Sequence, residues 1–308
     1  MARLTPGVAG LSAVFAAAAL FGTTGTAQAL GSSSAGVDLD PLAVGSARIA
    51  LAGLVLVPLA WLRGGFGPTS SAGVRRVLIG GVGVAVYQVG FFSGVQMAGV
   101  AAGTMIALGS GPAFTGVLQS LVDRTRPGPV WFASTTLAVA GMMLLVTGSD
   151  PDDASHMVFG ALAALSAGVG YAIYTVAGSR IIASGTRPDA AMAQMFAVGA
   201  VVLLPVLVLR WPGGLDSAPG LAVVLYLALI PTVVAYLLFG IGLSALPPAT
   251  VATLTLAEPV VAALLGIVVL GESPTVLAGI GMAVVASALI LLAVDVRRQS
   301  QRSTLSDN

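Results

Sequence analysis

The stretch Thr253–Gly266, TLTLAEPVVAALLG, decides how the chain folds, because it places a glutamate and a proline inside an apolar run. A carboxylate at the centre of a membrane span costs about 2.5–3.5 kcal/mol on insertion scales. Proline has no backbone N–H, so Pro259 leaves the carbonyl of Thr255 without its usual helical donor. If this run crosses a membrane, Glu258 must face protein or water, and the helix must bend at Pro259.

The composition of the whole chain points to a membrane. Of its 308 residues, 57% are hydrophobic and 8% are charged, whereas a soluble domain carries roughly 25% charged residues. So few charges cannot cover a water-facing surface, and we expect an all-α membrane protein. The net charge of +1 gives no electrostatic case for a nucleic-acid partner. With no cysteine and one histidine, we expect no metal site and no cofactor.

Ten apolar segments are long enough to cross a bilayer, which takes about 20 residues. The first of them also imitates a signal peptide, with Ala27-Gln28-Ala29 in the place of a cleavage site. Its length favours an uncleaved first span instead. The ten segments are residues 8–30, 41–62, 74–96, 99–121, 130–148, 157–180, 190–209, 219–243, 250–270 and 274–294.

The basic residues, all of them arginine, indicate how these segments are oriented. If the N-terminus is cytoplasmic, Arg210 is the one arginine left outside and Arg48 is the one arginine within a span. This is the asymmetry that the positive-inside rule requires. We therefore predict a multi-pass membrane protein with both termini cytoplasmic. The Ala-, Gly- and Arg-rich, lysine-free composition is typical of a high-GC bacterium, so the expected membrane is a bacterial plasma membrane. Trp61, Trp131 and Trp211 lie at predicted span ends, where they would anchor the helices at the interface. The arginines predicted to be cytoplasmic are Arg3, Arg63, Arg75, Arg76, Arg124, Arg126, Arg180, Arg187, Arg297, Arg298 and Arg302.

The two halves of the chain repeat each other. Pro112 corresponds to Pro259 at an offset of 147 residues, and the same offset relates Pro127 to Pro274. Each half holds five segments, and an odd number reverses the orientation of the second half. The sequence thus predicts ten transmembrane helices as two inverted five-helix repeats, a design that places a substrate site between the halves. The predicted units are residues 1–148, residues 157–294, and a disordered cytoplasmic tail over residues 295–308.

Several segments also resemble a known family. The run from Ala249 to Gly266, followed by Leu270-Gly271-Glu272, is similar to the ninth span of EamA-like proteins in the drug/metabolite transporter superfamily. Gly160–Arg180 resembles the sixth span of that family, and Ala47-Arg48 resembles its second. The resemblance covers about residues 8 to 294. It implies ten helices with both ends cytoplasmic and transport of small metabolites, often export of amino acids or related compounds.

Polar residues inside the spans are the candidate substrate contacts. Glu258 is either a carboxyl that holds neighbouring helices by hydrogen bonds or a protonatable group that meets the ligand. Arg48 either extends to the outer interface or forms a fixed cation in the cavity. In the cavity it would bind a substrate carboxylate with two parallel hydrogen bonds or pair with Glu258. Further candidates for the lining are Thr24, Gln28, Tyr87, Gln88, Tyr171, Tyr174 and Tyr236.

Pro112 and Pro259 are candidate hinges, because paired breaks in corresponding spans mark the binding site of many transporters. The alternative is that both prolines only bend their helices to aid packing.

These features favour a secondary transporter that exports small metabolites by alternating access, with a small-molecule substrate and membrane lipid as partners. The chain contains no GxxxxGK[ST] phosphate loop, and its spans lack histidine, cysteine, lysine and any pair of carboxylates, so we do not expect an enzyme. A facilitator that works without a gradient and a non-transporting scaffold remain alternatives. We expect a monomer or a homodimer.

Overall fold

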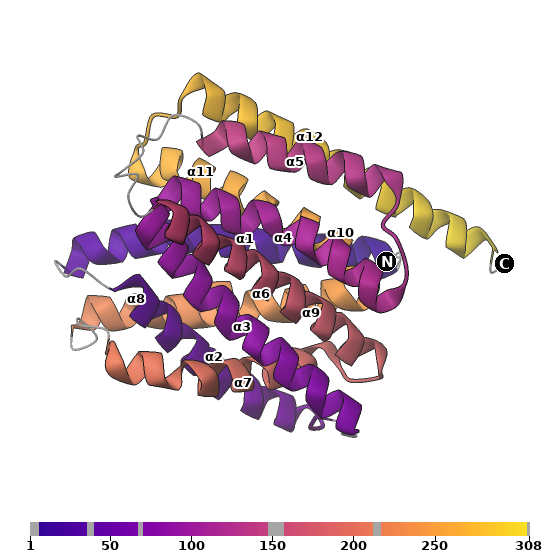
Figure 1. Ribbon diagram of the computed structural model, residues 1–308, viewed down its shortest axis with the longest axis horizontal. Helices are drawn as coiled ribbons and strands as arrows, with labels where there is room; N and C mark the ends of the chain where they lie inside the picture. The colour runs from indigo at the N-terminus through magenta and orange to yellow at the C-terminus, as the bar shows by residue number, and fades with distance from the viewer. Residues whose placement is uncertain (1–5, 36–39, 67–69, 147–156, 212–216, 307–308) are drawn as a thin grey trace, which may run out of the picture.

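The computed structural model describes residues 6–35, 40–66, 70–146, 157–211 and 217–306, and every regular element in these ranges is helical (Figure 1). The all-α class is therefore confirmed for this part of the chain. The elements in order are α1 (Pro6–Ala35), α2 (Pro41–Leu62), α3 (Ser71–Ala98), α4 (Val100–Asp123), α5 (Pro129–Val146), α6 (Met157–Ala183), α7 (Pro188–Leu209), α8 (Ala218–Ala228), η2 (Leu229–Val234), α9 (Ala235–Ala245), α10 (Pro248–Leu254), α11 (Ala257–Leu270) and α12 (Val276–Ser306).

The helices correspond, in order, to the ten apolar segments expected from the sequence. Within the described ranges, nine helical stretches are long and apolar enough to cross a membrane, and α5 is a shorter apolar helix. The eighth segment consists of α8, η2 and α9, and the ninth consists of α10 and α11. That all ten cross the bilayer stays a prediction.

The C-terminal helix continues where a disordered tail was expected. α12 runs on past residue 294 and stays helical to Ser306. The Gln299 Nε2 donates to Asp295 Oδ2 one turn earlier at 2.7 Å, and Ser300 lies against Gly7 at the start of α1. Residues 295–306 are therefore helical rather than disordered. The predicted boundary between the two halves, residues 148 to 157, falls largely outside the described residues.

The packing joins the first half of the chain to the second. α3 lies along α6, α2 along α7 and α5 along α12, while α1 packs against α9 and α11. In Figure 1, α5 and α12 form one edge of the bundle and α2 and α7 the opposite edge. α1 begins and α12 ends at the same end of the bundle (Figure 1).

Glycines allow a close backbone contact between α3 and α6. A Cβ at Gly170 would lie 2.6 Å from the backbone nitrogen of Tyr87 and 2.8 Å from the carbonyl oxygen of Gly83. Such distances are too short for a side chain, so the two backbones touch directly. Without a hydrophobic driving force between helices in lipid, this close van der Waals contact is a main source of association.

The three tryptophans do not share one role. Trp61 and Trp211 are 70% and 64% exposed, as expected of interfacial anchors. Trp131 is only 6% exposed, and its indole Nε1 donates to the carbonyl of Ala249 at 2.9 Å. Gly116 leaves the space that the ring fills. The interfacial role predicted for Trp131 is therefore wrong, because a buried indole N–H needs an acceptor and finds one on α10.

We predict that Gly170→Val lowers the melting temperature of the purified protein in detergent. The added side chain must push α3 away from α6, and overpacking of this kind costs about 1–3 kcal/mol. Gly279→Ala in α12 is the matched control, because a Cβ there meets nothing within 4 Å. Equal melting temperatures for Gly170→Val and the control would contradict the role of this contact.

Candidate functional site

The ninth segment is interrupted just before Glu258. α10 ends at Leu254 and α11 begins at Ala257. Since Pro259 has no N–H, the carbonyl of Thr255 accepts instead from the backbone nitrogen of Glu258 at 2.9 Å. The break places Glu258 in the first turn of α11, where the helix dipole favours a negative charge.

The corresponding proline behaves differently. α4 continues as one helix across Pro112. The interruption expected in the ninth segment is thus present, while the hinge roles of Pro112 and Pro259 stay predictions.

A second irregularity lies in the eighth segment and was not predicted from the sequence. η2 is a π-helical turn that contains Pro231, and the hydroxyl of Thr232 donates to the carbonyl of Leu227 at 2.7 Å. Tyr236 follows within the next turn. π-helical turns inside α-helices occur frequently at functional sites. The proline in LIPTVV was the only sequence signal for it.

Four tyrosines from three helices meet beside these two breaks. The ring of Tyr87 on α3 lies 6.0 Å from that of Tyr171 and 5.9 Å from that of Tyr174, both on α6. The hydroxyl of Tyr174 shares a hydrogen bond of 3.2 Å with that of Tyr236 on α9. The hydroxyl of Tyr171 shares one of 2.8 Å with Thr255, at the break in the ninth segment. The structure therefore brings all four predicted tyrosines into one cluster.

Arg48 on α2 is held against α3. Its Nη2 donates to Gln88 Oε1 at 3.2 Å, and its guanidinium lies 5.9 Å from the centre of the Phe92 ring. Gln88 is 1% exposed, and Arg48 is half-buried. Gly45, one turn before Arg48, admits the amide, because a Cβ there would overlap Gln88 Nε2. Phe92 was not predicted as part of the site, although its spacing of four residues from Gln88 places both on one face of a helix.

This pair retains hydrogen-bonding capacity that no described residue uses. Arg48 Nε and Gln88 Nε2 are buried, and neither has a partner among the described residues. Both atoms are N–H donors, and one belongs to a cation. A buried donor without an acceptor is costly, so a site of this kind is suited to a ligand that supplies acceptor atoms and negative charge.

Glu258 provides the opposite charge nearby. Its side chain is half-buried, and it forms no hydrogen bond or ion pair with any residue the structure describes. It lies close enough to Arg48, Tyr87 and Tyr236 to interact with them electrostatically. The site thus holds a guanidinium and an ionisable carboxyl group that are not in direct contact.

The two candidates on α1, Thr24 and Gln28, are half-buried and form no hydrogen bond within the described ranges. Their neighbour Thr23 is bonded instead. It accepts from the hydroxyl of Tyr226 at 3.0 Å and donates to its own helix at Leu20. Tyr226, on α8, was not predicted as a contact.

The end of the bundle that carries most arginines is tied together across the two halves. Arg187 at the start of α7 donates to the carbonyl of Arg63 at the end of α2 and pairs with Asp189 at 2.7 Å. Arg180 on α6 pairs with Asp123 on α4 at 2.5 Å. We call this end, where α2, α4 and α6 finish and α3, α5 and α7 start, the arginine-rich end.

A cleft of about 620 Å³ also lies at the arginine-rich end, between the segment joining α4 to α5, the start of α10, and α12. Gln119 and Trp131 line it, and both are bonded to the backbone of Ala249. At the opposite end, the bonds between halves among the described residues are those of Arg210 with Asp40 at 3.3 Å and of Tyr226 with Thr23.

Both halves of the chain match the model of one known family. The family model described as the EamA-like transporter family matches residues 8–147 and again residues 158–294. The chain belongs to this family. It is therefore a multi-pass membrane transporter with a small-molecule substrate.

Named relatives agree with this assignment. The chain is 36% identical over 286 residues to the uncharacterized transporter YwfM of Bacillus subtilis (strain 168), covering 93% of this chain and 94% of that one. It is 31% identical over 196 residues to the threonine/homoserine exporter RhtA of Escherichia coli (strain K12), covering 63% of this chain and 65% of that one.

A solved structure shares the fold. One crystal structure superposes with a TM-score of 0.76 at 22% sequence identity, covering 94% of this chain and 98% of that chain. At this identity the likeness concerns the fold alone.

We predict that Gln88→Leu destabilises the protein. It removes the acceptor of Arg48 and leaves a half-buried guanidinium without a partner, which costs about 1–3 kcal/mol. Thermal unfolding in detergent measures the effect. Gln28→Leu is the control, because Gln28 forms no hydrogen bond in the described structure, and it should unfold like the parent protein. If both variants were equally stable, the contact between Arg48 and Gln88 would carry no weight.

Proposed function

We propose that this EamA-family transporter exports small metabolites that carry a carboxylate, such as amino acids or related amphipathic compounds, by alternating access. The observation that carries the proposal is the pair of unused buried donors on Arg48 and Gln88. The name of RhtA, an exporter of threonine and homoserine, supports both the substrate class and the direction.

In this proposal each predicted site residue has a role. Arg48 and Gln88 hold the substrate carboxylate through directed N–H groups. Glu258 faces the ammonium group of a zwitterion or carries a proton. The rings of Tyr87, Tyr171, Tyr174 and Tyr236 contact the apolar part of the substrate, and Thr24 and Gln28 offer polar groups from α1.

The architecture required is ten membrane-spanning helices in two inverted repeats. The packing of the helices supports this architecture. When each helix is replaced by its counterpart in the other half, a pair of helices in contact becomes a pair that is also in contact. Under this exchange α3 on α6 corresponds to α9 on α1, and α4 on α6 corresponds to α11 on α1. α2 with α7 and α5 with α12 exchange with themselves. Two equivalent halves can rock about a shared site.

The arginine-rich end is the cytoplasmic end in this proposal, in accordance with the positive-inside rule. Both chain ends then face the cytoplasm. The bonds of Arg187, Arg180 and Trp131 across the halves keep this end closed, and they must break when the substrate is admitted from inside. Pro259 and Pro112 are the proposed hinges for that movement.

Two alternatives remain distinguishable. A facilitator would use the same binding site without coupling, so it would carry substrate only down its concentration gradient and would not accumulate it. A non-transporting scaffold would bind solute and move none of it. Flux measured in proteoliposomes separates all three.

The predicted topology can be checked with single cysteines, because the natural chain has none. The variants Thr125→Cys and Ser184→Cys place a thiol at the arginine-rich end. The variants Trp211→Cys and Ser273→Cys place one at the opposite end of the bundle. An impermeant maleimide added to intact cells should label only the latter two, and the first two should react only after permeabilisation. Labelling of cysteines from both ends on intact cells would rule out this orientation.

We predict that Arg48→Ala lowers the flux of carboxylate-bearing substrates into proteoliposomes by tenfold or more. Loss of a charge-assisted hydrogen bond costs about 1.5–3 kcal/mol. Gln88→Glu should be similarly impaired, because a carboxylate on α3 would neutralise Arg48. Thr24→Ser keeps the hydroxyl and should transport normally. Undiminished transport of acidic and zwitterionic compounds by Arg48→Ala would remove the proposed carboxylate site.

The role of Glu258 is tested separately with Glu258→Gln. If Glu258 carries the coupling proton, this variant loses accumulation driven by a pH gradient but retains exchange of substrate for substrate. Accumulation equal to that of the parent protein would instead favour a contact that does not take part in coupling.

A further inference from the structure

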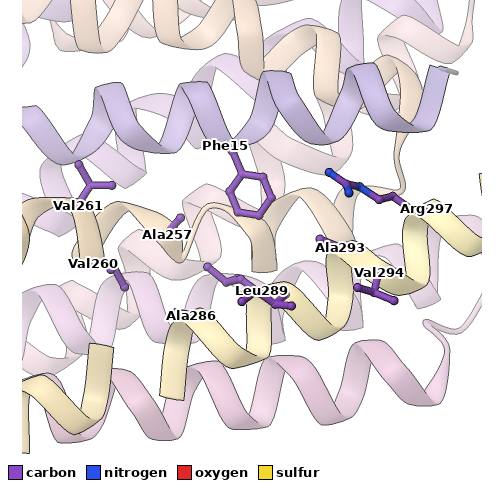
Figure 2. Close-up of a pocket in the computed structure, with 10 residues that line it drawn as sticks. Phe15, Ala257, Val260, Val261, Ala286, Leu289, Ala293, Val294 and Arg297 are labelled. Carbon is purple, nitrogen blue, oxygen red and sulfur yellow. The ribbon is translucent and has the colours of Figure 1, made fainter. Parts of the chain in front are cut away.

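A groove that the transport site does not include runs along the outside of the second half. α12 packs along α5 but only sparsely against α1 and α11. A hollow of about 410 Å³ therefore lies between α1, α11 and α12. Its walls include Phe15 on α1, Val260 and Val261 on α11, and Leu289 and Ala293 on α12 (Figure 2). Every side chain in this lining is apolar except that of Arg297.

The groove opens toward lipid. Ile290 and Val294, which form its rim on α12, are 64% and 39% exposed, and both are aliphatic. In a bilayer, such a hollow is filled by hydrocarbon. Lipid tails are as apolar as these side chains, so a chain that fills the groove gains little from hydrophobicity and is not selected by it. Any preference for one lipid must come from the polar end of the groove.

Arg297 lies at that polar end. It is exposed, it belongs to the part of α12 at the arginine-rich end, and its guanidinium extends toward Phe15 over the groove (Figure 2). It forms no ion pair with any carboxylate in the described part of the chain. The nearest acid along its own helix, Asp295, already accepts from Gln299 at 2.7 Å. An unpaired cation beside a chain-shaped apolar hollow is complementary to an anionic headgroup.

We propose that this groove binds one acyl chain of an anionic phospholipid of the surrounding membrane, with the lipid phosphate on Arg297. The chain packs on Val260 and Val261, in the first turns of α11. These are the turns that follow the break, and they also carry Glu258. A lipid bound here therefore contacts the helix whose movement the proposed transport cycle requires.

Lipid retention by the purified full-length protein tests the proposal. The protein is exchanged into detergent with equal amounts of phosphatidylglycerol and phosphatidylcholine of identical acyl chains, and bound lipid is counted by native mass spectrometry. The parent protein should retain phosphatidylglycerol preferentially. Arg297→Gln should reduce that preference about fivefold, which is the value of one arginine near a lipid headgroup.

Arg302→Gln is the matched control, because Arg302 is an exposed arginine of the same helix that does not line the groove. It should leave the preference unchanged. Ala293→Leu fills the groove and should lower retention of both lipids, and its melting temperature shows whether it is folded. Should this variant be unfolded, Ala286→Leu, about two turns earlier on the α12 wall of the groove, provides the same test.

The result that overturns the proposal is a phosphatidylglycerol preference that survives Arg297→Gln, or one that Arg302→Gln lowers equally. The second result would mean that lipid binds the arginines of α12 by charge alone. Retention of both lipids unaffected by Ala293→Leu and Ala286→Leu would equally exclude the groove as the binding site. None of these outcomes depends on the transported substrate.

Discussion

The whole molecule depends on one constraint, which is that hydrocarbon offers no hydrogen-bond partners, so the protein must satisfy its own polar groups. Helices meet this requirement along most of the chain. Where a proline removes a donor, the chain has to find another one locally, and at Thr255 it uses the N–H of Glu258. The resulting break moves a carboxylate to the start of α11, where the helix dipole lowers its cost. A local repair of the backbone thereby creates a position at which a charge can be kept inside the bundle.

The same constraint makes a buried polar group without a hydrogen-bond partner a candidate for ligand binding. Tyr171, Tyr174 and Tyr236 are buried, and all three hydroxyls are bonded, that of Tyr171 to Thr255 and those of Tyr174 and Tyr236 to each other. Arg48 and Gln88 are bonded to each other but keep two buried N–H groups unused. Ser134 Oγ and Thr175 Oγ1 are also buried without a partner among the described residues, but they belong to neutral hydroxyls. An unpartnered N–H group of a cation is costlier unless a ligand or water supplies an acceptor. The contrast between the satisfied tyrosines and the unsatisfied pair is what separates structural polar groups from candidates for binding.

Much of the fold follows from the sequence, because the bilayer leaves few alternatives to apolar helices of fixed minimum length. The ten segments and the break at Pro259 could be predicted for this reason. Contacts between distant segments could not. Arg48 and Gln88 are separated by 40 positions in the sequence, and only the packing of α2 on α3 shows that they form a pair. Trp131 was misjudged because position at a helix end says nothing about what lies beside it, and the tail at residues 295–306 was misjudged because its contact with Gly7 lies at the other end of the chain. The π-helical turn at Pro231 is invisible to hydropathy, which does not distinguish helix types.

The two halves share an architecture but have not kept the same chemistry. At the offset of 147 residues, Gly111 occupies the position that corresponds to Glu258. A Cβ at Gly111 would lie 3.3 Å from the ring of Tyr171, so the glycine makes room for an aromatic side chain of α6. In the second half, the equivalent turn faces α1, where Gly22 approaches the carbonyl of Glu258 and no tyrosine intrudes. One copy therefore supplies the charge, and the other supplies the space for the aromatic wall. In the site proposed above, a symmetric pair of glutamates would have placed two like charges together, and each would have raised the cost of ionising the other. In the proposed site, the glycine at position 111 therefore avoids this repulsion, while Glu258 keeps the carboxyl group in the second half.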